Sequence, residues 1–156
     1  MRGPRPGLIA AAALLYLVVL LVLLFAPLKI VRYHTRFWEL SDTYLGLGWT
    51  AARERVLDGA INVAMFLPLG FLVHRWRRHG AAPSRRGALE TIGVVAVLAI
   101  TSETVQIFLP TRYASVSDVL TDVAGAAIGA GLDSALAWIA LRRSPGAAET
   151  IGRERS

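Results

Sequence analysis

The sequence predicts an all-α integral membrane protein, a bundle of four transmembrane helices with a long outer loop between the first and second helices. Three observations predict this fold. Of the 156 residues, 54% are hydrophobic, a high share for a soluble domain. Four stretches reach the roughly 20 mostly apolar residues that a helix needs to cross a bilayer. Arginines gather in alternate connections between these stretches, as they do in cytoplasmic loops.

The first apolar stretch, about residues 8–27, contains no charged residue and ends at Pro27. Arg2 and Arg5 precede it, as basic residues precede the apolar part of a signal peptide. The apolar run is longer than that of a signal peptide and lacks a convincing small-residue cleavage site, so we expect a retained helix.

The other three stretches, about residues 56–74, 89–109 and 118–141, each carry polar residues that the first avoids. We expect them to span the membrane too, because a chain this short offers little soluble protein in which to bury them. The four helices form one domain, residues 1–141. Residues 142–156 are small, polar and of mixed charge, which predicts a disordered cytoplasmic tail.

Basic residues orient the predicted bundle. They lie before the first helix, between the second and third, and after the fourth, all on one side, which places both termini in the cytoplasm. Segment 28–55 conflicts with this rule, because it is basic and yet lies outside. Its aromatic residues suggest a position along the head-group interface. The basic run at 75–86, RWRRHGAAPSRR, is expected to set topology and to contact anionic lipid.

Several function classes are excluded or disfavoured by composition. The chain has no cysteine, which rules out disulfides, thiolate catalysis and cysteine-ligated metals. His34, His74 and His79 lack metal-ligand spacing, and there is no glycine-rich phosphate loop or nucleophile elbow. No basic run is interleaved with stacking aromatic residues, so we expect no nucleic acid partner. We therefore expect no metal and no cofactor, and membrane lipids as partners; nothing in the sequence fixes an oligomeric state.

Polar side chains concentrate in the outer halves of the last three predicted helices. Each group keeps helical spacing, so its members share a face. Arg112 lies on the short loop between the third and fourth helices. The groups are Asp58 with Asn62, Glu103 with Gln106, and a stripe of Asp118, Asp122, Gly125 and Gly129.

Ionisable groups at bilayer depth normally face protein or water and pair with one another. We therefore predict a polar pocket that opens to the outside, walled by the last three helices and roofed by the loop around Arg112. The glycines of the fourth helix form a GxxxG pattern suited to close packing, and the second helix offers an opposing surface. The predicted packing residues are Pro68, Gly70, Gly125 and Gly129.

Each polar residue also has a purely structural interpretation. Asp58 is better explained as a helix cap, and for Asp118, with Ser115 or Ser117 as alternative caps, the two interpretations are balanced. Asn62 and Gln106 suit interhelical hydrogen bonds, and Arg112 suits an interfacial anchor or a pair with Asp118. Glu103 is the strongest functional candidate, because a negative charge near a helix C-terminus is opposed by the macrodipole.

These residues resemble the VanZ-like family of small bacterial membrane proteins. The resemblance covers about half of the chain, from Asp58 to Leu132. It rests on Asn62, Phe66, Pro68 and Gly70 in one helix and on Glu103, Gln106, Phe108, Pro110 and Arg112, followed by Asp118, Gly125 and Gly129. Where the family pattern generally has asparagine, this sequence has Asp122, which adds a potential negative charge.

The resemblance implies a protein of the bacterial cell envelope associated with resistance to teicoplanin-type antibiotics. A lipid-linked cell-wall precursor or a lipoglycopeptide is the partner that it implies. We expect a non-catalytic protein that binds a lipid-linked or anionic head group through Asn62, Glu103, Gln106, Arg112, Asp118 and Asp122.

Two other function classes stay open. An intramembrane enzyme could act on a cell-wall or lipid precursor with Glu103 and Asp118 or Asp122 as acid and base. A transporter or proton relay would need polar residues that continue toward the cytoplasm. It ranks last, because the inner halves of the helices are expected to be apolar, as at Phe71, Leu72, Val94, Val95, Leu136 and Ile139.

Overall fold

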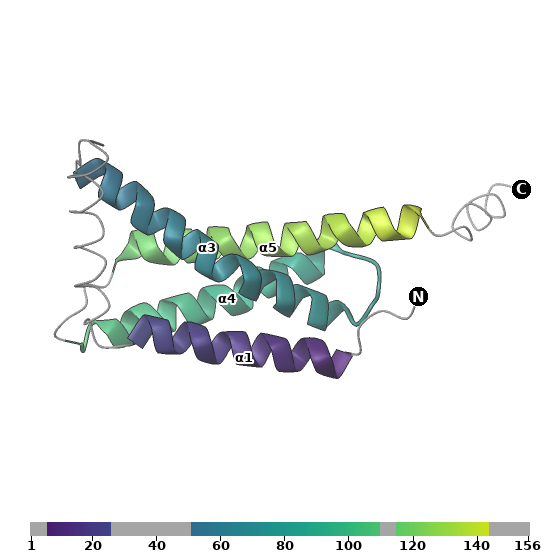
Figure 1. Cartoon of the computed structure of the whole chain (residues 1–156), viewed down its shortest axis with the longest axis horizontal. Helices are drawn as coiled ribbons and strands as arrows, with labels where there is room; N and C mark the ends of the chain where they lie inside the picture. The colour runs from purple at the N-terminus through teal and green to yellow at the C-terminus, as the bar shows by residue number, and fades with distance from the viewer. Residues whose placement is uncertain (1–5, 26–50, 110–114, 144–156) are drawn as a thin grey trace, which may run out of the picture.

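A computed structural model describes residues 6–25, 51–109 and 115–143, with side chains from residue 56 in the second range. Within these ranges the chain forms four helices and no strand: α1 (Pro6–Phe25), α3 (Ala51–Arg78), α4 (Arg85–Gln106) and α5 (Val116–Arg142) (Figure 1). Each helix is long and apolar enough to cross a membrane. The predicted fold class, a bundle of four transmembrane helices, is therefore confirmed.

The helices extend beyond several of the apolar stretches that predicted them. α3 begins five residues before the predicted start at 56 and ends at Arg78 rather than 74, and α4 begins at Arg85 rather than 89. α4 also ends at Gln106, three residues before the predicted end. Apolar runs mark what lipid covers, whereas backbone hydrogen bonds continue into polar turns until a cap or a turn residue ends them.

Local signals in the sequence fix these ends. Ser84 is extended and its hydroxyl accepts a hydrogen bond from the Gly87 N–H at 3.1 Å, which caps α4. Ser115 caps α5 in the same way through the Ser117 N–H at 3.2 Å. After α3 the backbone turns left-handed at His79 (φ 47°) and Gly80 (φ 84°), a conformation that glycine tolerates and that stops the helix.

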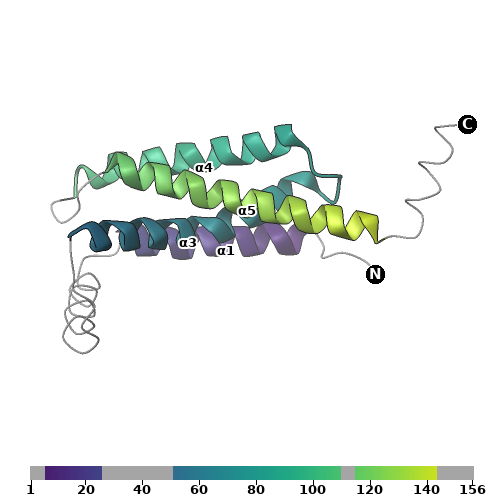
Figure 2. The ribbon, with the colours of Figure 1, turned by 90° about the horizontal axis from the view of Figure 1, so that it is seen from above.

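The α3–α5 crossing is the closest contact between helices in the bundle. A Cβ built on Gly125 or Gly129 of α5 would overlap the backbone of α3 at Val63 or Leu67. On the other side of the contact, a Cβ on Gly70 would overlap the backbone of Ala126. The two backbones therefore touch directly, which gains dispersion contacts along the whole crossing. Figure 2 shows α5 crossing α3 at an angle near the middle of the bundle.

Pro68 lies within α3, between the glycine contacts. A proline inside a helix removes one backbone N–H and weakens hydrogen bonding in the preceding turn. The Met65 carbonyl of that turn accepts a hydrogen bond from the Tyr16 hydroxyl at 2.7 Å. This bond joins α1 to α3 and satisfies a phenol that would otherwise lie in hydrocarbon.

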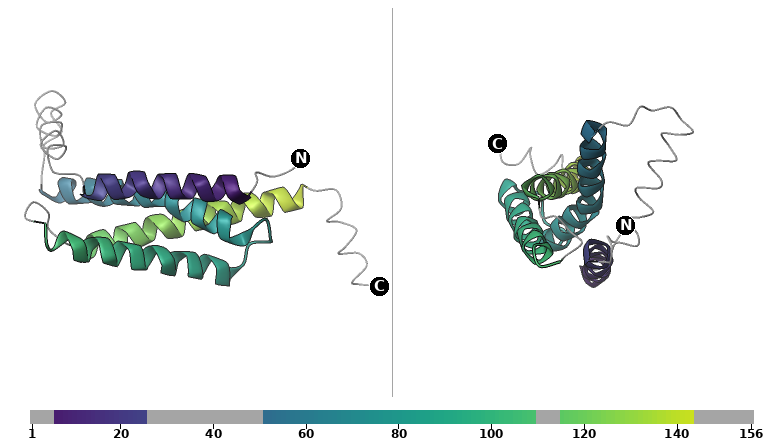
Figure 3. Two further views of the ribbon diagram at one scale, coloured as in Figure 1. Left: turned by 90° about the horizontal axis from the view of Figure 1, so that it is seen from below. Right: turned by 90° about the vertical axis from the view of Figure 1, so that its left-hand side faces the viewer.

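α1 lies at the side of a group formed by the other three helices (Figure 3). Its Leu20 enters the hydrophobic core, which all four helices share. The remaining face of α1 is exposed and apolar, as expected where a helix faces lipid rather than protein. The buried core side chains are Leu20, Phe66, Leu69, Val95, Ala99 and Ala126.

The start of α1, the end of α3, the start of α4 and the end of α5 gather at one end of the bundle (Figures 1 and 3). We call this the arginine end, after the arginines at 75–86. The C-terminus of α4 and the N-terminus of α5 lie at the opposite end, which we call the carboxylate end. The predicted loop at 28–55 and the predicted tail at 142–156 lie mostly outside the described residues.

Candidate functional site

Glu103 joins two helices at the carboxylate end. It lies in the last turn of α4, and its side chain is 8% exposed. Its Oε2 accepts a hydrogen bond at 2.7 Å from the backbone N–H of Ser115, the cap of α5. The dipole of α4 disfavours a negative charge there, but the N-terminus of α5 favours one. The position of Glu103 is therefore explained by the neighbouring helix rather than by its own.

Asp122 lies on α5 one turn after Asp118, and it is 2% exposed. Its Oδ1 is buried and makes no hydrogen bond within the described part of the chain. The carboxyl group interacts electrostatically with those of Asp118 and Glu103, and Asp118 interacts in turn with Asp58. Four acidic side chains from three helices thus gather at one end of the bundle.

Two of the other predicted site residues follow members of this acidic group by one helical turn, Gln106 after Glu103 and Asn62 after Asp58. Gln106 of α4 is buried, at 4% exposure, and Asn62 of α3 is half-buried. Arg112, the predicted counter-charge, lies outside the described residues, as does most of the loop expected to roof the pocket. The outward-opening pocket therefore stays a prediction.

The structure corrects the interpretation of Asp58 as a cap. α3 begins at Ala51, so Asp58 lies about two turns inside the helix, where no free N–H groups remain to be capped. The capping role at the start of α5 belongs to Ser115, and Asp118 occupies the first turn. A carboxylate in a first turn is stabilised by the helix dipole, so Asp118 keeps a structural explanation beside its place in the acidic group.

The structure also shows a second buried polar group, which the sequence prediction missed. His74 and Asp133 are 1% and 0% exposed, at the arginine end of the bundle. The Asp133 Oδ2 lies 2.9 Å from His74 Nδ1 and accepts a hydrogen bond from Arg78 Nε at 2.7 Å. The Asp133 Oδ1 accepts longer bonds of 3.4 Å from Arg78 and Arg75.

The expectation that the inner halves of the helices are apolar is therefore wrong at His74 and Asp133. A buried aspartate is tolerated there because two arginines and a histidine neutralise it and satisfy its oxygens. Its position had a signal in the sequence. Asp133 follows Gly129 by four residues on the stripe already identified, and His74 follows Gly70 by four residues on the opposing helix.

The two polar groups have different chemistry. Negative charge dominates the described residues at the carboxylate end, whereas arginines outnumber carboxylates at the arginine end. No group of three histidine, aspartate or glutamate side chains in the described ranges is arranged to hold a metal ion.

Comparison with known proteins agrees with the residues that suggested a family. A search of curated proteins and a search of solved structures each returned no match. The VanZ/LLP1 family matches residues 13–139, a range that includes both polar groups and the glycine crossing. The chain therefore belongs to the VanZ/LLP1 family and is a multi-pass membrane protein.

Proposed function

We propose that this VanZ/LLP1 protein is a non-catalytic receptor of the bacterial cell envelope that binds the head group of a lipid-linked ligand at its carboxylate end. The observation that carries the proposal is the buried Oδ1 of Asp122, which has no hydrogen-bond partner within the described residues. Leaving a buried carboxylate oxygen unsatisfied costs free energy, so such a group indicates a place where a donor from another molecule binds.

The acidic side chains define which part of a ligand would bind there. Carboxyl oxygens accept hydrogen bonds, so hydroxyl, amide or ammonium groups of a head group suit Glu103, Asp118 and Asp122. Gln106 offers both a donor and an acceptor beside them. An anionic part of the same head group, such as a phosphate, would require a cation, and Arg112 is the residue that the sequence offers for this role.

The arginine distribution supports an outward-facing carboxylate end. Arg75, Arg77, Arg78, Arg85 and Arg86 all belong to the arginine end, and short basic connections remain in the cytoplasm. A carboxylate end on the outside would meet cell-wall precursors and glycopeptide antibiotics, in line with the resistance that the family resemblance implies.

Native mass spectrometry of the purified protein tests the binding proposal. We expect a co-purifying lipid that Glu103→Gln and Asp122→Asn release and that Arg112→Ala also releases. Thr104→Val is the matched control, because Thr104 lies next to Glu103 in α4 but is exposed on the helix surface. A lipid retained by all three site variants, or lost equally from the control, would contradict the proposal.

Antibiotic susceptibility tests the envelope function separately. Deletion of the gene is expected to lower the teicoplanin concentration that inhibits growth, and complementation with the wild-type chain is expected to restore it. Because Glu103→Gln is expected to release the lipid, it should fail to complement; complementation by this variant would indicate that shape and hydrogen bonding matter more than the charge of Glu103. An unchanged inhibitory concentration after deletion would argue against a role in resistance and leave the binding result unaffected.

The gathered carboxyl groups also favour a second candidate, an intramembrane acid–base enzyme. Catalysis of this type needs two carboxyl groups in different protonation states, and Asp122 interacts with both Glu103 and Asp118. The Glu103→Gln variant distinguishes the enzyme from the receptor. An enzyme should lose turnover in Glu103→Gln while the lipid still binds, whereas a receptor should lose the lipid itself.

A further inference from the structure

A cavity of about 440 Å³ lies at the arginine end, between the last turns of α3, the following turn and the first turns of α4. Its volume is in the range of small-ligand sites. A smaller cavity of about 220 Å³ lies nearby against the start of α1 and shares Trp76, Arg78 and His79 with it. Besides His79, the polar residues of the larger cavity are His74, Arg77, Arg78, Ser84, Arg86 and Glu90.

The charge around the cavity is positive. Arg77 and Arg86 both contact one carboxylate, Glu90, at 2.7 and 2.9 Å, and Arg78 pairs with the buried Asp133. Among the described residues that line the cavity, Glu90 is the single acidic one, and it is shared by two cations. An anion would meet more positive than negative charge there, provided that it binds on the arginine side and away from Glu90.

His74 forms the buried wall of this cavity. An ionised carboxylate can only accept, so the Nδ1 that contacts Asp133 at 2.9 Å carries a proton. The other nitrogen, Nε2, lies 3.9 Å from where a Cβ on Gly87 would be, and Gly87 also lines the cavity. Nε2 makes no hydrogen bond with the described residues. When Nε2 is protonated as well, the ring presents a charged donor to the cavity, held in place by Asp133.

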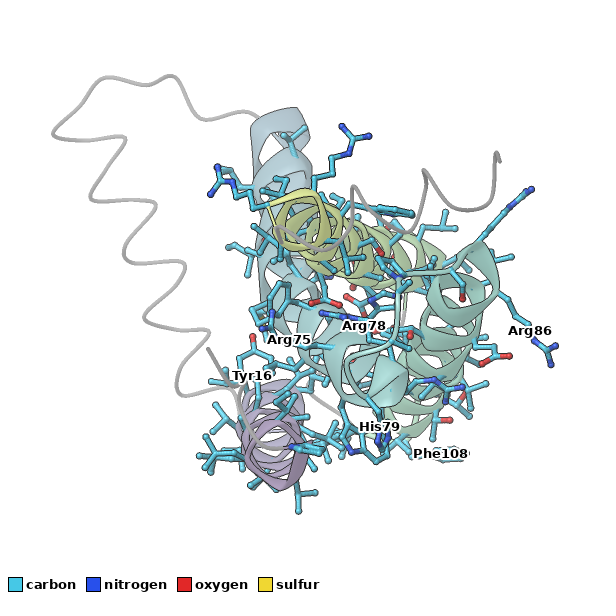
Figure 4. The ribbon with its side chains drawn as sticks, turned by 90° about the vertical axis from the view of Figure 1, so that its right-hand side faces the viewer. Tyr16, Arg75, Arg78, His79, Arg86 and Phe108 are labelled. Atoms are coloured by element: carbon cyan, nitrogen blue, oxygen red, sulfur yellow. The ribbon has the colours of Figure 1, made fainter. Side chains whose placement is uncertain are left out.

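The start of α4 adds a further preference for negative charge. α4 begins at Arg85, its first turn contains no acidic residue, and Ser84, Arg86 and Gly87 line the cavity. The N-terminus of a helix carries partial positive charge and attracts phosphate groups. Figure 4 shows this end of the bundle, with Arg78 near its centre and Arg86 extending from the outer rim.

We propose that this cavity is a phosphate-binding site, with His74 as the buried donor, Arg77 and Arg86 as rim cations, and the start of α4 as the third contact. Arg78 acts as a positioning residue, because it holds Asp133, which in turn orients His74. The phosphate belongs either to an anionic lipid head group or to a free phosphate or phosphate ester. This site lies at the opposite end from the proposed receptor site and does not depend on it.

Two probes distinguish the sources of the phosphate. Inorganic phosphate is titrated into the detergent-solubilised full chain by calorimetry, and phosphatidylglycerol binding is counted by native mass spectrometry against phosphatidylcholine. We expect Arg86→Gln and Arg77→Gln to weaken binding of the probe by about tenfold each, the loss expected for one charged hydrogen bond. If inorganic phosphate binds, the phosphate group is sufficient for binding. If phosphatidylglycerol binds and inorganic phosphate does not, the ligand is a lipid head group.

Arg85→Gln is the matched control for these variants. It removes the same charge from the adjacent position, but Arg85 does not line the cavity. His74→Asn tests the buried donor, because the asparagine amide can still donate to Asp133 while nothing replaces Nε2. We expect it to weaken binding by about tenfold with an unchanged melting temperature.

Equal losses in Arg85→Gln and Arg86→Gln would overturn the proposal in favour of diffuse attraction to the basic surface. Failure of the wild-type chain to bind either probe would overturn it as well. If His74→Asn does not fold, the comparison of Arg77→Gln and Arg86→Gln with Arg85→Gln still decides, because both Arg85 and Arg86 are exposed.

Discussion

Replacing Gly129 by alanine should separate α3 from α5. A Cβ at this position would overlap the Leu67 carbonyl oxygen and lie 2.7 Å from the Phe71 nitrogen, whereas ordinary contacts begin at 3.4 Å. The Phe71 contact alone falls 0.7 Å short of an ordinary contact, and the Leu67 oxygen is closer still, so the backbones would have to part by more than this, because neither atom belongs to a side chain that can rotate away. Overpacking of this kind destabilises by about 1–3 kcal/mol, and more where the backbone must shift.

Thermal unfolding of the detergent-solubilised protein measures this effect. A loss of about 1–3 kcal/mol corresponds to a fall of several degrees in melting temperature for a chain of this size. Gly131→Ala is the matched control, because it makes the same chemical change two residues further along α5, where a Cβ would meet nothing within 4 Å. Alanine favours helix over glycine, so the control should be unchanged or slightly more stable. Equal melting temperatures for the two variants would refute the direct backbone contact.

Three further predictions use the same unfolding assay. Asp133→Asn should destabilise by about 3 kcal/mol, because it removes the buried carboxylate that His74 and Arg78 share, whereas Glu90→Gln, at an exposed ion pair, should change little. Equal losses of stability in Asp133→Asn and Glu90→Gln would contradict the argument that the buried carboxylate contributes more than the exposed one. Tyr16→Phe should cost about 0.6–1.5 kcal/mol through loss of its bond to the Met65 carbonyl, and an unchanged melting temperature would show that the bond is not formed. Ser84→Ala should cost about 1 kcal/mol by removing the cap of α4, with Ser84→Gly recovering most of it. Failure of glycine to recover stability would indicate that the hydroxyl acts elsewhere.

Much of the carboxylate end could be predicted from sequence because helical spacing is a local property. Glu103 with Gln106, and Asp118 with Asp122, share faces whatever surrounds the helix. One pair lies at the end of α4 and the other at the start of α5, so the short connection between these helices places both pairs at the same end of the bundle. What spacing could not supply was the partner of each group. That the Ser115 N–H would satisfy Glu103 depends on where α5 begins relative to α4, and this is decided by packing.

The arginine end was harder to predict, for a physical reason. Arg78 belongs to the basic run at 75–86 and His74 directly precedes it, and such runs are usually solvated in the head-group region. Asp133 is 55 residues from Arg78 and 59 from His74, so the one indication that they meet is their spacing from Gly129 and Gly70 on the two packed helices. The glycine contacts bring α3 and α5 close enough for a short aspartate side chain to reach the histidine and two arginines.

The sequence by itself determined that this protein is a four-helix membrane protein, because apolar length and arginine placement depend only on the order of residues along the chain. It also determined where close helix packing would occur, because glycine spacing defines the thin face of α5. Only the tertiary structure decided which charged side chains pair with one another and which carboxyl oxygens have no hydrogen-bond partner among the described residues. Pairing depends on distances of about 3 Å between residues far apart in sequence, and these distances follow from the angle and depth at which the helices cross.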